Sequence, residues 1–200
     1  MQTTERAGCR RCGERLPVGG RGRVPSYCST RCRVAAYRAR RAEEALPPEL
    51  ARGRRWVRRD GKRPIRADNG RSASATDPFT WTTHPRAARS EHGDGLGRVL
   101  AAGDRLVCID LDHCLSGGRL AGWARKIVDR CPPTYTEVSP SGTGLHIWGR
   151  GEVTRGRRIR RPDGAHIEVY GAGRYIALGR RHERSPLELA DLSDLVAELT

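Results

Sequence analysis

The 200 residues are enough for one domain of ordinary size and one small module, and they carry 38 basic and 23 acidic side chains. No stretch approaches 18 apolar residues and the N-terminus has no apolar signal core, so the sequence predicts a cytoplasmic protein without a membrane span and with reduced cysteines. The formal net charge is +15, of which residues 1–66 carry +13 and residues 67–200 only +2.

The basic front third of the chain is the first functional signal. Arginine supplies all of the basic residues except Lys62 and Lys126. Guanidinium groups are always charged and match the oxygens of a phosphate, so a one-sided excess of arginine predicts contact with nucleic acid. The alternative is that arginine only occupies solvated faces, as in proteins encoded by GC-rich genomes. We favour nucleic-acid contact because the excess is concentrated in one segment.

Four cysteines in this front part have the spacing of a structural zinc site. Cys9, Cys12, Cys28 and Cys32 follow the pattern C-x2-C-x15-C-x3-C. Four thiolates satisfy the tetrahedral preference of Zn²⁺, and the metal would supply the folding free energy that so short and polar a segment lacks. The alternative is a segment with reduced, unligated cysteines. Cys32 opens an arginine-rich helical run, and this arrangement resembles a treble-clef zinc finger.

Two prolines mark the boundary of this first module. Leu46–Leu50 reads LPPEL and is expected to break the helix, because proline lacks an amide donor and clashes with the preceding turn. We therefore expect a basic four-cysteine zinc-binding module in residues 1–45 and a second domain in residues 46–200. The other cysteines have no metal-ligand spacing and are expected to pack as small hydrophobic residues. They are Cys108, Cys114 and Cys131.

The second domain reads as alternating short strands and helices. Turn residues separate apolar runs that predict strands, and these lie at residues 56–57, 95–101, 105–111, 134–138, 144–148, 166–170 and 174–178. Helical signals predict helices from a Thr83 cap to about residue 91, over about residues 118–130, and in two C-terminal pieces that start at Ser185-Pro186. The pattern predicts an α+β or mixed α/β domain preceded by a zinc module.

Two aspartates end the strand predicted at residues 105–111. Asp110 and Asp112 are two residues apart, so on a strand they project from the same face. Carboxylates this close repel each other unless a cation lies between them, and Mg²⁺ or Mn²⁺ prefers such oxygen ligands. The alternative is a pair of solvated aspartates at a strand end.

Two further segments carry polar residues of the same kind. Ser141, Gly142 and Gly144 lie in a loop whose glycines let amide groups approach an anion, and His146 follows on the next predicted strand. The alternative is an ordinary hairpin loop and a surface histidine. The strand at residues 166–170 places Glu168 on one face with His166 and Tyr170, which makes Glu168 a third candidate metal ligand, and Arg174 follows within reach of a phosphate.

The order of these three motifs resembles the signature of the archaeo-eukaryotic primase superfamily. The likeness is closest to the bifunctional primase/polymerase domain of phage and plasmid replication proteins, and it covers about residues 46–200. Upstream landmarks of the same kind are Trp56-Val57, the Lys-x-Pro at Lys62 and the Asp-Pro-x-Thr-Trp that ends at Trp81. The resemblance implies an RRM-like sheet with flanking helices and with the acids on one sheet face.

The resemblance also implies roles for individual residues. Asp110, Asp112 and Glu168 would hold the catalytic Mg²⁺ or Mn²⁺ ions, and with His146 they form the expected catalytic set. The expected nucleotide-binding residues are Ser141, Gly142, Gly144, His146 and Arg174. Lys62 matches an upstream basic position to which no role is assigned. The expected partners are a single-stranded DNA template, NTPs or dNTPs, and a separate replicative helicase, since related proteins often continue into a helicase domain.

Two other functions fit part of the sequence. A nucleotide-sugar glycosyltransferase also places Mn²⁺ on paired aspartates, but it explains neither the basic front third nor the histidine and glutamate motifs. A non-catalytic DNA-binding protein would use the zinc module alone and carry a degenerate primase-like domain. Such a remnant would be expected to have lost some of its acids, and all of them are present.

Overall fold

The computed structural model describes residues 8–16, 25–43, 45–183 and 185–200. The chain divides into two compact units, Met1–Ala45 and Leu46–Thr200, which are treated separately below. None of the described helices is both long enough and apolar enough to cross a lipid bilayer.

The first unit joins a tight turn to a helix. The amide of Cys9 donates to the carbonyl of Glu14, and that of Gly13 donates to the carbonyl of Cys9, so residues 9–14 fold back on themselves. The helix α1 (Thr30–Glu43) covers most of the predicted helical run. Its start is capped by Ser29, whose hydroxyl accepts a hydrogen bond from the amide of Cys32 at 3.2 Å.

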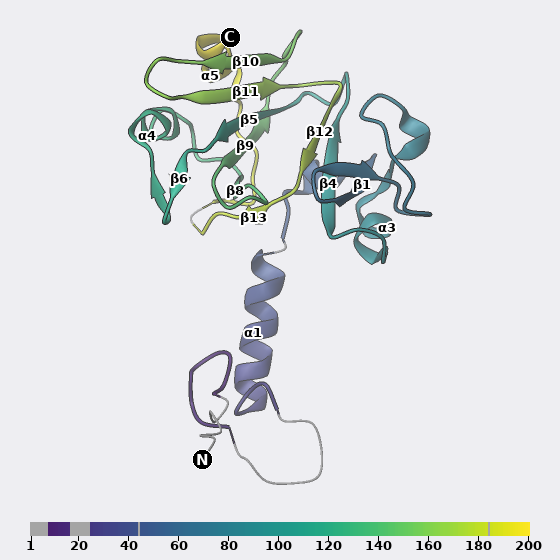
Figure 1. Cartoon of the computed structure of the whole chain (residues 1–200), viewed down its shortest axis with the longest axis vertical. Coiled ribbons are helices and arrows are strands. Elements are labelled where there is room, and N and C mark those ends of the chain that lie inside the picture. The colour runs from purple at the N-terminus through teal and green to yellow at the C-terminus, as the bar shows by residue number, and fades with distance from the viewer. Residues whose placement is uncertain (1–7, 17–24, 44, 184) are drawn as a thin grey trace, which may run out of the picture. The chain divides into compact units, whose positions relative to one another are not determined.

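The centre of the second unit is a six-stranded, fully antiparallel sheet (Figure 1). In spatial order its strands are β10 (Arg157–Arg160), β11 (His166–Tyr170), β5 (Leu106–Asp112), β9 (Leu145–Arg150), β8 (Thr136–Val138) and β13 (Arg180–Arg181). β5 has an almost continuous buried pattern because both of its faces are covered over most of its length.

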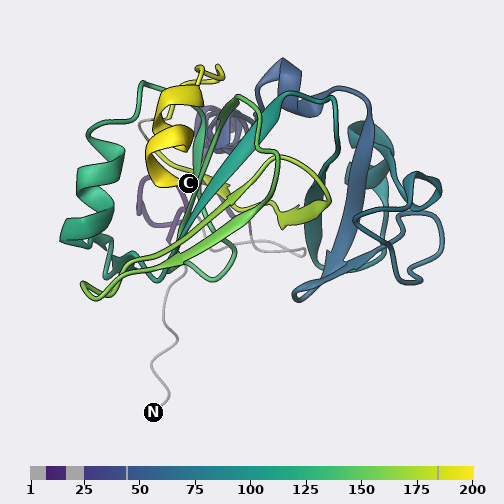
Figure 2. The same cartoon turned by 90° about the horizontal axis from the view of Figure 1, so that it is seen from above.

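One face of this sheet packs against two helices, α4 (Gly122–Val128) and α5 (Ser193–Leu199). Val107, Ile109 and Leu111 point to this face from β5 and are fully buried. Figure 2 shows both helices on one side of the six-stranded sheet and the second sheet on the other. Because side chains alternate along a strand, Cys108, Asp110 and Asp112 must point to the face away from the helices.

A second antiparallel sheet has five strands. Four of them follow the order β12 (Arg174–Ala177), β4 (Gly95–Leu100), β1 (Arg54–Asp60) and β2 (Arg63–Ile65), and β3 (Thr82–Thr83) also pairs with β1. β12 follows β11 directly, so the chain passes from one sheet to the other between Tyr170 and Arg174. An apolar cluster that includes Leu100, Trp148 and Ile176 packs the two sheets together.

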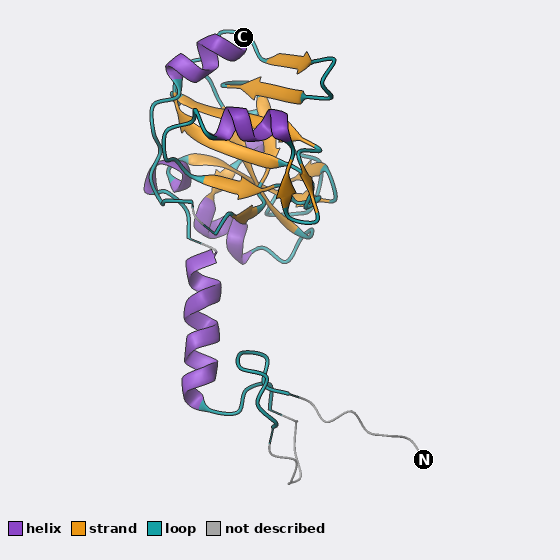
Figure 3. Ribbon diagram, turned by 90° about the vertical axis from the view of Figure 1, so that its left-hand side faces the viewer, coloured by secondary structure: helices purple, strands orange, loops and turns teal. Residues whose placement is uncertain are grey.

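The remaining elements are short, and strands outnumber helices in this unit (Figure 3). They are the helices α2 (Pro48–Ala51) and α3 (His84–Arg89), the 3-10 helix η1 (Pro78–Thr80), and a hairpin of β6 (Leu115–Ser116) and β7 (Arg119–Leu120). The prediction of an α+β fold class is confirmed by this mixture of antiparallel sheets and flanking helices.

Several predicted elements have other boundaries in the structure. The helix predicted over residues 118–130 covers only Gly122–Val128, because Arg119–Leu120 pairs as a strand with Leu115–Ser116. Thr83 precedes α3 as expected, but its side chain makes no capping hydrogen bond. The strand predicted at residues 56–57 is the longer β1, and the structure adds β2, β10 and β13, which the sequence did not indicate.

The prediction of a helix starting at Ser185-Pro186 is wrong. The structure has a single C-terminal helix, α5, and residues 186–192 are not helical. The Ser185 hydroxyl accepts a hydrogen bond from the amide of Thr136 at 2.7 Å, so it satisfies β8 rather than a helix of its own. A tertiary hydrogen bond therefore replaces the local capping preference.

The three scattered cysteines partly follow the expectation of apolar packing. Cys108 and Cys114 are buried, and both belong to apolar clusters of the second unit. Cys131 is only half-buried, and its thiol donates to the carbonyl of Pro132 at 3.4 Å.

Candidate active site

The candidate site lies on the face of the six-stranded sheet that the helices leave free. Strand register brings one residue from each strand into a single row across this face. The row runs Arg158, Glu168, Asp110, His146, Glu137 and Arg181, and each is the direct cross-strand neighbour of the next. Direct neighbours in an antiparallel sheet have side chains about 5 Å apart, so the row places charges of both signs in contact.

Three carboxylates gather at the centre of this row. One oxygen from each of Asp110, Asp112 and Glu168 lies within 4.8 Å of the others, and all three side chains are partly buried. Asp110 Oδ1 is buried without a hydrogen-bond partner. Oxygen ligands at this spacing, one of them unsatisfied, fit a divalent cation of the Mg²⁺ or Mn²⁺ type.

The electrostatics of Asp110 point the same way. Burial is the main cause that raises the pKa of Asp110 to about 6, and the charges of Asp112 and Glu168 add to it, while His146 acts in the opposite direction. A proton and a metal ion compete for the same carboxylate, so a bound cation would hold Asp110 ionised at neutral pH.

Glu168 is held in position by three donors. The hydroxyl of Tyr170 donates to Glu168 Oε2 at 2.7 Å, and Arg174 reaches the same oxygen at 3.2 Å. Arg158 lies 3.2 Å from the other oxygen, Oε1. Arg174 also stacks on the ring of Tyr170, with its guanidinium carbon 4.5 Å from the ring centre. Two guanidinium groups therefore lie at the edge of the carboxylate cluster.

His146 is fixed by a buried glutamate. Its Nδ1 lies 2.8 Å from Glu137 Oε1, and its Nε2 lies 3.6 Å from Asp110 Oδ1. Burial alone would lower the pKa of His146, but the hydrogen bond to Glu137 and the charges of Glu137, Asp110 and Asp112 outweigh it and raise that pKa. His146 is therefore biased toward the protonated form, with one ring nitrogen directed at the carboxylate cluster.

The loop between β8 and β9 carries a chain of hydroxyl groups. Ser141 Oγ lies 3.0 Å from Ser139 Oγ and 2.9 Å from Thr143 Oγ1, and Ser139 Oγ accepts from the amide of Gly144 at 3.0 Å. Gly142 has a φ of +77°, which favours glycine. At Gly144 a Cβ atom would meet the carbonyl oxygen of Leu111 at 2.9 Å, so glycine lets this loop lie against the end of β5.

A small cavity adjoins this loop. Its volume is about 350 Å³, which lies within the range of roughly 300–1,000 Å³ for small-molecule sites. Ser139, Pro140 and Gly142 line it from the loop, and Arg59 and Arg180 add two positive charges. The loop thus faces a space with hydroxyl and guanidinium donors, which is a suitable environment for an anion.

The first unit contains a second candidate metal site. The sulfur atoms of Cys12, Cys28 and Cys32 lie 3.6–3.7 Å apart, and Cys9 belongs to the same cluster. Sulfur atoms at the corners of a tetrahedron with Zn–S bonds of about 2.3 Å are about 3.8 Å apart, so the donor set fits zinc. The neighbouring thiols, that of Cys32 above all, raise the pKa of Cys28 to about 12, so several thiolates here require a cation.

Carboxylates, a protonatable histidine and an anion-binding loop on one sheet face are typical of enzymes that transfer phosphate-containing groups with divalent cations. Comparison with known proteins is more specific: residues 26–199 match the family described as bifunctional DNA primase/polymerase, N-terminal, and the chain belongs to that family. Its members are nucleotidyltransferases, and the predicted enzyme class is thereby confirmed.

One curated relative agrees with this assignment. The chain is similar to the DNA primase-polymerase of Nitratiruptor phage NrS-1, with 38% identity over 140 residues. The similar region is 64% of this chain and 19% of the phage protein, so the chain spans about a fifth of the length of that relative. The family match also includes all of α1, and therefore crosses the boundary between the two units.

The structure brings most of the predicted site residues together. Asp110, Asp112, Glu168 and His146 share one face, and Arg174 contacts Glu168. Ser141 and Gly142 lie in the adjoining loop, whereas Lys62 is an exposed residue of the turn between β1 and β2. The roles of all these residues remain predictions.

Sequence reasoning missed Glu137, Arg158 and Tyr170. Glu137 is fully buried in a strand that was predicted, and its place as the one charged residue of the predicted strand 134–138 was the available signal. Arg158 lies on β10, a strand that was not predicted because its sequence is mostly arginine. Tyr170 was correctly predicted to share a face with Glu168, but no role was given to it.

Replacing Asp110 by Asn is expected to stabilise the protein in EDTA. Asp110 has a pKa of about 6 in the fold against 3.8 as its ordinary value, so the unfolded chain ionises first as the pH rises. The protein therefore loses stability as the pH rises from about 4 to about 6. At about pH 7.5 the ionisation of Asp110 lowers the free energy of unfolding by on the order of 2–3 kcal/mol. Thermal unfolding should show a higher midpoint for Asp110→Asn at about pH 7.5 and nearly equal midpoints at about pH 4.

The exposed residue Asp129 provides the matched control for this experiment. Asp129→Asn removes the same charge from the surface and should leave the midpoint nearly unchanged at both pH values. A wild-type protein as stable as Asp110→Asn at the higher pH would contradict the strained carboxylate cluster.

Replacing Glu137 by Gln is expected to lower the pKa of His146 and to weaken activity. The change keeps the size of the side chain but removes the charge that favours the protonated ring. Loss of a partner that orients a functional histidine typically costs about 10–100-fold in activity. NMR titration of the His146 ring should show the lower pKa, and the alkaline limb of the pH–rate profile should move to lower pH.

Glu188→Gln, at an exposed position of the same charge, is the control and should change neither quantity. An unchanged pH profile in a folded Glu137→Gln protein would reduce Glu137 to a structural role.

Proposed function

We propose that this chain synthesises primers on single-stranded DNA by metal-dependent nucleotidyl transfer, in the replication of a phage, a plasmid or another mobile element. The observation that carries the proposal is the cluster of Asp110, Asp112 and Glu168 beside His146, in which a buried oxygen of Asp110 has no hydrogen-bond partner. Family membership supports the class of reaction, whereas the substrates and the residue roles are inferred from the site.

The reaction joins a 3′-hydroxyl to the α-phosphate of an incoming nucleotide and releases pyrophosphate. Asp110, Asp112 and Glu168 would hold two Mg²⁺ or Mn²⁺ ions, and when bound these ions would lower the pKa of the attacking hydroxyl and neutralise charge on the leaving pyrophosphate. The residues of the chain supply position and charge, which is most of what phosphoryl transfer requires. Arg158 and Arg174 keep the Glu168 carboxylate oriented toward the two aspartates.

The incoming NTP or dNTP would bind between the loop and the carboxylates. His146, biased toward its protonated form by Glu137, would donate from Nε2 to a phosphate oxygen. The Ser141 hydroxyl and the backbone near Gly142 and Gly144 would contact the triphosphate. The cavity of about 350 Å³ beside the loop offers the adjoining space. When a cation binds the Glu168 carboxylate, Arg174 would be released from its hydrogen bond to Glu168 and could contact a phosphate.

The finer features of the fold belong to the same proposal. We assign the six-stranded sheet to an RRM-like primase/polymerase domain in residues 46–200, and residues 1–45 to a treble-clef-like module with structural Zn²⁺ on Cys9, Cys12, Cys28 and Cys32. Arginines of α1, among them Arg31 and Arg33, would contact the template phosphates. A separate replicative helicase and a cytoplasmic location complete the proposed setting.

The direct test is primer synthesis and extension by purified protein. Single-stranded DNA, labelled NTPs or dNTPs, and Mg²⁺ or Mn²⁺ would be supplied to the wild type and to the double variant Asp110→Ala/Asp112→Ala. We expect metal-dependent products from the wild type and at least about a thousandfold loss in the double variant, because the ligands of a charge-neutralising metal are removed.

The control and the contrary outcome use the same protein preparations. The variant Asp129→Ala/Asp163→Ala removes two exposed aspartates and should retain synthesis. Absence of product from folded, zinc-loaded wild type that still binds DNA would favour a non-catalytic DNA-binding protein. Equal synthesis by wild type and the Asp110→Ala/Asp112→Ala variant would exclude these aspartates as metal ligands.

A further inference from the structure

The edge strand β10 carries a concentration of arginine that the candidate active site does not explain. Residues 154–161 read TRGRRIRR and contain five arginines and no acid, although residues 67–200 as a whole have a net charge of only +2. All five arginines are exposed. Of these five, only Arg158 has an acidic partner within the described part of the chain, Glu168, while several other arginines of this unit form ion pairs.

The register of β10 aligns this run with the catalytic face. Arg158 is opposite Glu168, and Arg160 is opposite His166, which is itself opposite Asp112. Arg158 and Arg160 therefore project from the same face as the carboxylates, at the acidic end of the sheet. β10 is the outermost strand of its sheet, so a long ligand has open access to this edge (Figure 1).

The other end of β10 opens onto a large cavity of the second unit. The cavity has a volume of about 1310 Å³ and lies beside the first residues of β5, at the end of that strand away from Asp110 and Asp112. Seven arginines and four acids line it. A space this large exceeds an ordinary small-molecule site of roughly 300–1,000 Å³ and suits a longer, anionic ligand.

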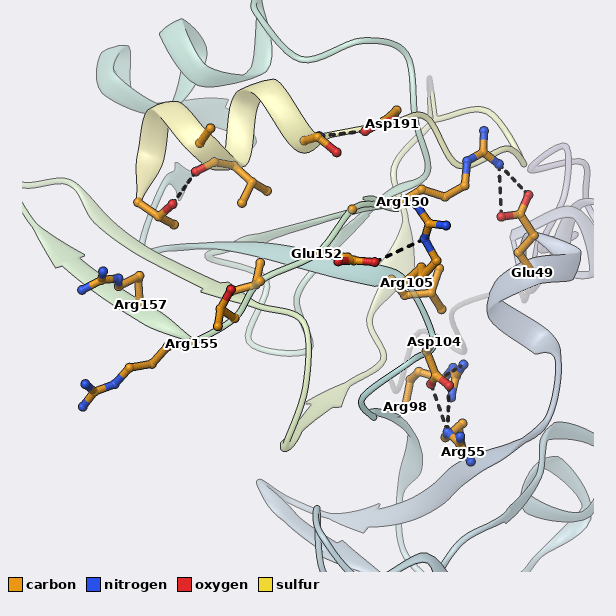
Figure 4. A pocket seen from close by; sticks show the side chains of 18 of the residues that line it. Glu49, Arg55, Arg98, Asp104, Arg105, Arg150, Glu152, Arg155, Arg157 and Asp191 are labelled. Carbon is orange, nitrogen blue, oxygen red and sulfur yellow. Dashed lines mark hydrogen bonds and ion pairs between the residues drawn. The ribbon is translucent and has the colours of Figure 1, made fainter.

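The ion pairs inside the cavity leave a positive side facing β10. Arg150 pairs with Glu49 at 2.8 Å, and Arg55 pairs with Asp104 at 3.0 Å. Figure 4 shows Arg155 and Arg157 side by side, away from these pairs and without an interaction to any residue drawn. Arg155 and Arg157 line the cavity, and Arg157, opposite Val169, projects from the helix-packed face, whereas Arg160 projects from the carboxylate face. β10 therefore carries arginines along its edge from the cavity to the carboxylate face.

A simpler explanation for the charges on β10 is that they keep this edge strand from pairing with another chain. Edge strands often carry charged residues that prevent pairing with another chain. One or two charges achieve this, and they need no particular neighbour. Four arginines, Arg155, Arg157, Arg160 and Arg161, have no acidic partner among the described residues and follow one another along the sheet edge from the large cavity, an arrangement that suits a linear anionic partner.

We propose that the arginine edge, defined as Arg155, Arg157, Arg160 and Arg161 on and beside β10, binds the sugar-phosphate backbone of a single strand of nucleic acid. The strand would run along β10 between the large cavity and the carboxylate cluster. The proposal rests on the proposed function, because it takes the template or primer of that reaction as the ligand. Arg158 is set apart, since it holds Glu168.

The test is the salt dependence of single-stranded DNA binding by the full chain. The quadruple variant Arg155→Gln/Arg157→Gln/Arg160→Gln/Arg161→Gln leaves the carboxylates, His146 and Arg158 intact. Each phosphate contact on a single strand contributes about 0.7 to the slope of log Kobs against log salt, so this slope should fall by about 2–3. At about 0.1 M salt the affinity should fall at least about tenfold.

Two matched variants separate this surface from net charge and from misfolding. The triple variant Arg119→Gln/Arg125→Gln/Lys126→Gln removes three exposed cations from β7 and α4 and should leave the slope within about 0.7 of wild type. Lysine at the four edge positions keeps the charge and should keep the slope. A slope unchanged in the quadruple variant, or lowered equally in the triple variant, would overturn the proposal.

The outcome is independent of catalysis. The variant Asp110→Ala/Asp112→Ala should bind DNA with the wild-type slope even though it makes no product. If the wild type makes no product but the quadruple variant loses slope, the proposed function fails and the arginine edge stands as a nucleic-acid site. If the wild type makes product and the quadruple variant keeps its slope, the arginine edge fails and the proposed function stands.

Discussion

The structure depends on one electrostatic constraint, the close approach of Asp110, Asp112 and Glu168 on a partly buried sheet face. Like charges within 4.8 Å of one another destabilise a fold unless something neutralises them. Neighbouring positive groups offset this repulsion. Arg158 and Arg174 form ion pairs with Glu168, and His146 lies beside Asp110. The cluster is thus tolerable without a cation, and Asp110 Oδ1, which has no hydrogen-bond partner, can still accept one.

The rest of the fold explains how such a cluster is tolerated. The opposite face of the six-stranded sheet is packed by α4 and α5 against fully buried residues such as Ile109 and Leu111. That apolar face fixes the register of β5, since a shift of one residue would turn the aspartates toward the helices. Hydrophobic burial on one side of the sheet therefore holds the charges in place on the other.

Local patterns in the sequence predicted the parts of the site that depend on a single strand. Alternation placed Asp110 and Asp112 on one face, and the polar, glycine-containing segment 139–144 was predicted as a loop, in which Gly142 adopts a φ of +77°. The pairing of distant strands was not readable in this way. The burial of Glu137 follows from its register opposite His146, and no local signal encodes that register.

Two other differences have the same origin. Ser185 favours a helix start by its chemistry, but its hydroxyl is used by the amide of Thr136, a residue 49 positions away. β10 was missed because an edge strand pairs on one side only and shows little apolar alternation, here a single Ile159 among arginines. Contacts between residues far apart in the sequence therefore determine the structure where local preference predicts it wrongly. One strand missed in this way, β10, is also the strand whose arginines the candidate active site does not explain.

The central claim is that the three carboxylates together bind divalent cations next to His146. The most direct measurement is diffraction at the manganese absorption edge from crystals grown with Mn²⁺ and a nucleoside triphosphate. The account predicts an anomalous peak within about 2.4 Å of oxygens from Asp110, Asp112 and Glu168, with His146 Nε2 in hydrogen-bond contact with a phosphate oxygen. A triphosphate and metal bound elsewhere, with Glu168 still held only by Arg158, Tyr170 and Arg174, would contradict it.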